Sequence, residues 1–96
     1  MPGKVRVVNE TDDGNGSYES GFQFQAIMGT GRAPVPVGGE FTFQNVSHGR
    51  HDLNFDSGIK GVKSGHTSIN ISDDFDDFLC KVSMKGLDWK ISVVPQ

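Results

Sequence analysis

The sequence has little that could cross-link the chain or carry it through a membrane. One of its 96 residues is cysteine, Cys80, so no disulfide can form within the chain. No apolar run approaches the roughly 20 residues that a membrane-spanning helix needs, and the first residues lack the apolar stretch of a secretion signal. We therefore expect a cytoplasmic protein without a membrane span, held together by packing alone.

Positive charge is also scarce. Nine Lys and Arg residues stand against 12 Asp and Glu residues, which gives a net charge of −3. Proteins that bind duplexes usually present a basic face, so the composition argues against nucleic acid as a partner.

Four glycosylation-type triplets favour a different location, outside the cell. The Asn-x-Ser/Thr triplets begin at Asn9, Asn15, Asn45 and Asn70. Asn, Ser and Thr also gather near turns for structural reasons. We keep the cytoplasmic interpretation, with a secreted protein whose N-terminus has been processed as the alternative.

No segment shows the period of an amphipathic helix. Apolar residues instead recur at every second position, which is typical of half-buried strands. The runs are Val5–Val7, Phe22–Met28, Phe41–Phe43, Leu53–Phe55, Ile69–Ile71, Phe78–Met84 and Leu87–Val93. Thirteen glycines, with Asn, Asp and Ser clusters, separate them as turns. The pattern predicts one all-β domain over residues 1–96, an antiparallel β-sandwich of about seven or eight short strands, with a small closed β-barrel as the alternative.

The last two runs predict a hairpin with a definite register. A two-residue turn at Lys85-Gly86 places the apolar residues of both runs on one face. The expected pairs are Met84 with Leu87, Val82 with Trp89, Cys80 with Ile91 and Phe78 with Val93. On the other face Lys81 would lie opposite Lys90. Like charges repel in that position, so the two lysines are a candidate site for an anion or an acidic partner.

A second hairpin is predicted around the loop Ser47-His48-Gly49, with Gly49 in the left-handed conformation. Phe43 would then pair with Leu53, and Asn45 would meet His51. Two further expectations concern later segments. Ile59 would pair with Ile69, and Ser72 would cap a short helical turn from Asp73 to Asp77.

Two short segments resemble parts of known families. Residues 39–49, GEFTFQNVSHG, running on to Leu53 and Phe55, resemble a hairpin of carboxypeptidase-regulatory, transthyretin-like sandwich modules. Residues 86–94, GLDWKISVV, resemble the closing strand of a βγ-crystallin motif, although the calcium signature of that family is missing. The two families differ in topology and each segment is short, so the sequence assigns the chain to neither.

Acidic side chains gather in two places that are candidate calcium sites. Asp13 and Asn15 have the spacing of a calcium loop, but its first and last ligand positions hold Thr11 and Phe22. The second place is the run Asp73, Asp74, Asp76 and Asp77. A cation would relieve the repulsion within that run, whereas a solvated connection needs none. We expect no metal or other cofactor, with calcium as the alternative.

Histidines flank the tip of the second predicted hairpin. Ser47, His51 and Asp52 are close in sequence and are the residues of a candidate small hydrolase, although closeness in sequence is not triad geometry. The chain has no nucleophile elbow and no phosphate-cradling glycine loop. Zinc needs three or four converging ligands, and a His51 side chain hydrogen-bonded to Asn45 is the favoured interpretation. We therefore expect that the protein is not an enzyme.

Polar loops on a rigid sheet are typical of a binding module. We expect a non-catalytic, lectin-like module that binds carbohydrate through loops and sheet edges. The alternative is a protein-interaction or self-assembling domain that forms homo-oligomers, and the small hydrolase comes third. The candidate ligand contacts are Tyr18, Asn45, His48, His51, Asp52, Lys81 and Lys90.

Overall fold

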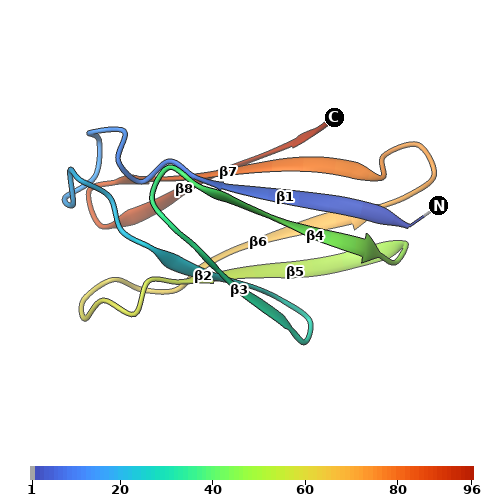
Figure 1. Ribbon diagram of the computed structural model, residues 1–96, viewed down its shortest axis with the longest axis horizontal. Helices are drawn as coiled ribbons and strands as arrows, with labels where there is room; N and C mark the ends of the chain where they lie inside the picture. Colours follow the sequence, from blue (N-terminus) through green and yellow to red (C-terminus); the bar gives the residue numbers. More distant parts are fainter. Residues whose placement is uncertain (1) are drawn as a thin grey trace.

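The computed structural model describes residues 2–96, which form eight β-strands and no helix (Figure 1). The strands are β1 (Gly3–Asn9), β2 (Phe24–Met28), β3 (Gly31–Val35), β4 (Glu40–Val46), β5 (Gly49–Asp56), β6 (Gly65–Ile71), β7 (Asp77–Lys85) and β8 (Asp88–Pro95). Along β1 and β2 every second side chain is buried, as the alternation in the sequence predicts. The all-β prediction is confirmed.

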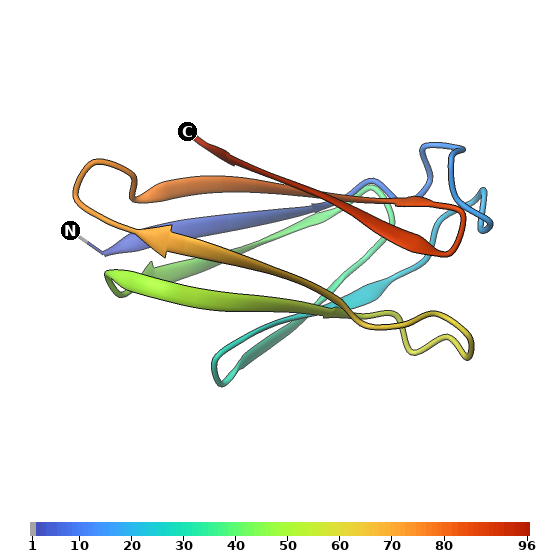
Figure 2. The same ribbon diagram turned by 180° about the vertical axis from the view of Figure 1, so that it is seen from behind.

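The strands form two facing sheets, with the orders β4-β1-β7-β8 and β3-β2-β5-β6 (Figures 1 and 2). The sheets do not close on each other, so the sandwich is confirmed over the barrel. Neighbouring strands run antiparallel, except that β1 and β7 are parallel. Most of the chain separates β1 from β7, so the short links that favour antiparallel neighbours do not constrain this pair.

One hydrophobic core lies between the sheets. Its largest wholly buried apolar side chains come from both layers: Phe24, Phe55, Leu53, Ile71, Met84, Val5, Val7, Val35 and Val82. Cys80 is a free thiol in this core. Burial raises the pKa of the Cys80 thiol from its ordinary 9.0 to about 12, so it packs as a small apolar side chain.

The C-terminal hairpin is present, but its predicted register is wrong by two residues. Lys85 pairs with Asp88, so the turn is Gly86-Leu87. Gly86 has φ 63°, and glycine suits the first central position of tight hairpin turns, where φ is positive. The pairs are Met84 with Trp89, Val82 with Ile91 and Cys80 with Val93. A shift of two keeps every strand residue on its predicted face, but Leu87 moves into the turn and is 50% exposed.

The second predicted hairpin is wrong, because β4 and β5 belong to different sheets. Phe43 lies opposite Val5 of β1, and Leu53 lies opposite Met28 of β2. The chain crosses between the sheets at residues 47–48, and Gly49 has the positive φ expected of it, 117°. Phe43 and Leu53 face the core in a hairpin and in such a crossing alike, so their alternation could not distinguish the two.

Two smaller expectations also need correction, and one strand was missed. Ile59 lies in the connection before β6, and Ile69 pairs with His51 instead. The Ser72 hydroxyl accepts a hydrogen bond from the Phe75 N–H at 3.2 Å, as a cap would, but residues 73–77 are not helical. Strand β3 was not predicted. It contains Pro34, which a strand at a sheet edge tolerates.

Candidate functional site

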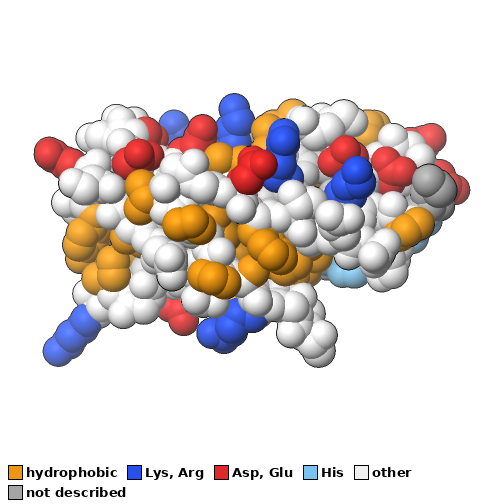
Figure 3. All heavy atoms as spheres, viewed as in Figure 1, with side chains coloured by type: hydrophobic (Ala, Val, Ile, Leu, Met, Phe, Trp, Pro, Cys, Tyr) orange, Lys and Arg blue, Asp and Glu red, His pale blue; other side chains and the backbone are white. Residues whose placement is uncertain are grey.

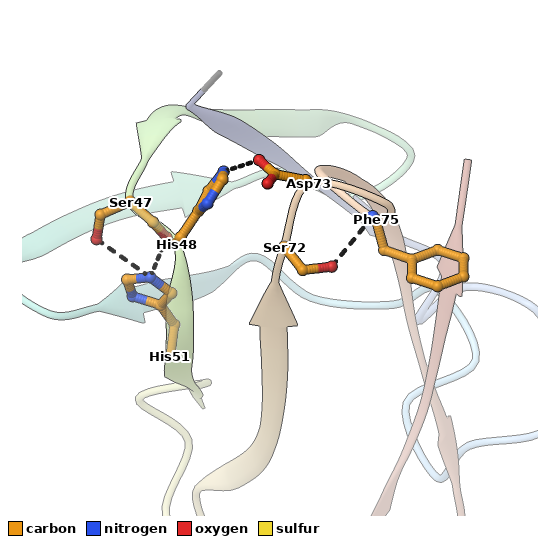
Figure 4. A network of polar contacts seen from close by, with 6 residues as sticks. All are labelled: Ser47, His48, His51, Ser72, Asp73 and Phe75. Atoms are coloured by element: carbon orange, nitrogen blue, oxygen red, sulfur yellow. Dashed lines mark hydrogen bonds and ion pairs between the residues drawn. The ribbon is translucent and has the colours of Figure 1, made fainter.

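Most of the predicted ligand contacts lie at the end of the sandwich where β4 crosses to β5 and β6 turns toward β7 (Figure 4). His51 Nε2 is 2.7 Å from the carbonyl oxygen of Ser47 and 3.5 Å from its hydroxyl. The partner of His51 is therefore Ser47, and the predicted contact with Asn45 is wrong. Asn45 lies in β4 with φ 56°, the one positive φ outside glycine in the described part of the chain.

The residues of the weakly indicated hydrolase do not converge. Asp52 follows His51 in β5, and successive strand residues point to opposite faces of a sheet. The Asp52 carboxylate lies 3.7 Å from the Arg50 guanidinium and 3.6 Å from His66 Nε2. Ser47 and His51 thus meet without Asp52, which belongs to a charged cluster on the outer face of β5 and β6.

The acidic run and the calcium-like loop each have internal partners. His48 Nε2 is 3.7 Å from Asp73 Oδ1, across the gap between the two connections (Figure 4). Asp13 Oδ1 accepts a hydrogen bond from the Asn15 N–H at 3.1 Å, which closes a local turn. Within residues 2–96, no three His, Cys, Asp or Glu side chains lie close enough together to hold a metal ion.

The two candidate lysines are not opposite each other, because the hairpin register differs from the prediction. Lys81 pairs with Ser92, and Lys90 pairs with Ser83. Lys90 instead shares a shallow hollow of about 270 Å³ with Lys85 and Asn15. The predicted like-charge pair is therefore wrong.

Tyr18 lies in the connection between β1 and β2. The residue is 37% exposed, and its ring meets Phe22 edge to face with centroids 5.7 Å apart. Phe22 in turn meets Trp89 at 5.8 Å. Tyr18 is therefore the outer member of an aromatic cluster, separated from the histidines named with it as ligand contacts.

Trp89 is half-buried and closes one end of the gap between β6 and β8. Its indole N–H donates to the carbonyl oxygen of Lys63 at 2.5 Å. The ring lies so close to Gly65 that a Cβ there would come within 2.8 Å of Cγ and Cδ2. A cleft of about 490 Å³ remains beside the ring, with Lys63, His66 and Asp88 among its lining residues. We call it the Trp89 cleft.

One glycosylation-type triplet serves the fold. Asn9 is wholly buried, and its side-chain amide donates to the carbonyl oxygens of Phe22 at 2.8 Å and Val35 at 2.9 Å. Its side-chain oxygen accepts from the N–H and the hydroxyl of Thr11. In the folded protein Asn9 is therefore not accessible to a glycan. Asn15, Asn45 and Asn70 are exposed.

The far end of the gap between β6 and β8 is open, which the sequence interpretation missed. A groove of about 340 Å³ lies there, lined by Ile69, Ser72, Phe75, Phe78, Val93 and Pro95, among others. We call it the Phe75 groove. Phe75 is 54% exposed, and its ring extends away from the histidine end (Figure 4). Phe75 stands between aspartates, and an aromatic ring inside an acidic turn was the signal that could have drawn attention to it.

Strand β8 runs along the same side of the molecule, which faces the viewer in Figure 2. It pairs with β7 on one edge, and no other strand of residues 2–96 pairs with its second edge. The Gln96 N–H donates to the Asp77 carbonyl oxygen at 2.8 Å. Hydrogen-bonded pairs alternate along antiparallel strands, so Val94, Ser92, Lys90 and Asp88 direct their backbone groups to β7. Those of Trp89, Ile91 and Val93 point outward from the edge.

Comparisons with models of protein families, with curated proteins and with solved structures found no match. In residues 2–96 there is no helix of the length and apolarity needed to cross a membrane.

Proposed function

We propose that the protein is a non-catalytic interaction module that binds an extended, apolar segment of a protein along the open side between β6 and β8. One observation carries the proposal: the unpaired edge of β8 lies directly beside the Phe75 groove. An added strand gains main-chain hydrogen bonds from the edge, and pockets that receive its alternate side chains supply specificity.

The chemistry of the open side fits such a segment. The inward-facing side chains of β8 are apolar but only half-buried: Trp89, Ile91 and Val93. The backbone N–H and C=O groups of β8 that point away from β7 are available to pair with another strand. By contrast, the histidine end has Ser47 and His51 already bonded to each other, and the Phe75 ring points away from them (Figure 4).

A display library of short random peptides tests the proposal. We expect selected peptides to carry apolar residues at every second position and to bind Phe75→Ser about tenfold more weakly, the effect of one modest anchor residue. Phe41→Ser is the matched control, because Phe41 is also a partly exposed aromatic side chain but lies on the opposite side, in β4. Selection of no extended peptide, or equal loss of binding in both variants, would overturn the proposal.

Carbohydrate binding is the second candidate, and the Trp89 cleft is the observation that favours it. The cleft combines an indole ring with the polar side chains of Lys63, His66 and Asp88, the mixture of apolar surface and placed polar groups that small-ligand sites use. A glycan array tests it. Specific binding that His66→Ala abolishes supports the candidate, and signals no higher than background for every glycan rule it out.

A further inference from the structure

We infer that the segment bound at the open side is β8 of a second copy of the chain, paired antiparallel so that Ile91 of one copy lies opposite Ile91 of the other. The inference rests on the proposed function and names its partner. It follows from three independent properties of residues 87–95: their outward backbone groups, their charges and their exposed apolar side chains.

The backbone groups select the antiparallel register. Trp89, Ile91 and Val93 direct their N–H and C=O groups outward, as the alternation from the Gln96–Asp77 bond requires. With Ile91 opposite Ile91, each Trp89 lies opposite the Val93 of the other copy. All outward residues of both strands then meet as hydrogen-bonded pairs, and each pair exchanges two N–H···O bonds.

The neighbouring registers are worse for identifiable reasons. Sliding one copy by two residues in one direction puts Lys90 directly opposite Lys90, where like charges repel. Sliding it in the other direction puts Pro95 opposite Trp89, and proline has no N–H to donate. In the proposed register Lys90 lies opposite Ser92 and Asp88 opposite Val94, so no like charges face each other directly.

The apolar side chains are complementary in this arrangement as well. On the inward face Ile91 meets Ile91, and Trp89 meets Val93. Beyond them, the turn residue Leu87 of each copy comes opposite Pro95 of the other, at the mouth of the Phe75 groove. Leu87 is one of the exposed large apolar residues, and the groove is the apolar hollow beside β8. In the antiparallel dimer the Leu87 side chain and the Phe75 groove of each copy are therefore both covered by the other copy.

Symmetric cross-linking tests the register. In the proposed dimer the Cα atoms of the two Ile91 residues lie about 5.5 Å apart, within the range that a disulfide spans. We expect Ile91→Cys to form a covalent dimer under mild oxidation at least tenfold faster than Lys90→Cys or Ser92→Cys, which are self-opposed only in other registers. The buried Cys80 does not compete. Cross-linking of Ile91→Cys no faster than of the two controls overturns the inference.

Sedimentation velocity over a range of concentrations tests the dimer without a new cysteine. We expect the wild-type chain to pass from monomer to dimer as its concentration rises, and Leu87→Lys to need at least tenfold more protein. Val37→Lys, an exposed apolar residue on the β3/β4 side, should behave like the wild type. A chain that stays monomeric overturns the inference. If that monomer still binds extended peptides at the Phe75 groove, the proposed function stands. If it binds none, both fail.

Discussion

The two open sides of the sandwich are held together by different means. On the β3/β4 side the chain itself passes from one sheet to the other through residues 36–39. The backbone of Asn9 is hydrogen-bonded to this connection. The Gly38 N–H donates to the Asn9 carbonyl oxygen, and the Asn9 N–H donates to the Gly39 carbonyl oxygen. The Asn9 side chain adds bonds to Val35 in β3 and to Phe22 in the connection before β2. Figure 3, seen from this side, shows hydrophobic side chains in separate clusters among polar ones.

On the β6/β8 side half-buried apolar side chains join the sheets, with Trp89 at one end and Phe78 at the other. Trp89 lies over Gly65 and donates to Lys63 at one end, while the Phe75 groove occupies the other. Between them the outward backbone groups of β8 have no strand partner within residues 2–96. Strands β3, β4 and β6 also end their sheets, so an open edge alone does not distinguish the two sides. The β8 edge differs because it lies beside the apolar Phe75 groove, where an added strand gains side-chain contacts as well as hydrogen bonds.

Removing the Asn9 amide should have the largest effect on the fold. In Asn9→Ala the Val35 carbonyl oxygen loses the amide donor and the Thr11 N–H loses its acceptor, while the Phe22 carbonyl oxygen keeps the Thr11 hydroxyl. Each buried group left unsatisfied costs about 1–3 kcal/mol. We expect a loss of about 3–5 kcal/mol in the free energy of unfolding, measured by chemical denaturation. Asn70→Ala removes an exposed amide and should change it by less than about 0.5 kcal/mol. Equal losses would show that Asn9 does not hold the β3/β4 side together.

A methyl group at Gly65 should loosen the other side by a smaller amount. The Cβ of Gly65→Ala would lie 2.8 Å from the indole ring, and overpacking of this kind costs about 1–3 kcal/mol. Trp89 is the one tryptophan, so its fluorescence reports the displacement directly. We expect a red shift of the emission together with the loss of stability. Ser64→Ala, one residue away and exposed, should change neither, and an unshifted emission in Gly65→Ala would contradict the closure by Trp89.

Cys80 supplies a reference point in the core, away from both sides. Its folded pKa of about 12 exceeds the ordinary 9.0 because burial disfavours the thiolate. Above pH 9 the unfolded chain releases this proton and the folded protein keeps it. The free energy of unfolding should therefore fall with rising pH, by about 1 kcal/mol between pH 9 and 10. Cys80→Ala should lack this part of the slope, and an unchanged slope would mean that the thiol reaches solvent.

The buried faces of the strands could be predicted from the sequence because a period of two assigns each residue to a face. Val5, Phe24 and Val82 are buried as their alternation requires. Partners were harder to predict. The same apolar pattern on 41–55 fits a hairpin or a crossing between sheets, and a shift of two in the last hairpin leaves all faces unchanged. The positive φ of Gly86 fits the observed register, in which Gly86 is the first residue of the turn.

The candidate site was less predictable than the fold, because it depends on which strand lies at the edge of its sheet beside a groove. The contact of His51 with Ser47 could have been predicted, because the two residues are only four positions apart in the sequence. The Phe75 groove joins β6, β7 and β8 with the connection before β7. Its existence depends on the strand order, which alternation does not specify. The buried role of Asn9 could not be predicted, because nothing in its local sequence indicates that carbonyl groups far along the chain converge on it.

Amide hydrogen exchange along β8, followed residue by residue at low and high protein concentration, tests the central claim most directly. The account predicts that Lys90, Ser92 and Val94 are protected at both concentrations, because their N–H groups face β7. Trp89, Ile91 and Val93 should exchange rapidly in dilute protein and become protected in concentrated protein, when a second β8 covers the edge. Protection of these three amides that does not change with concentration, or that is equal to that of their neighbours, would contradict it.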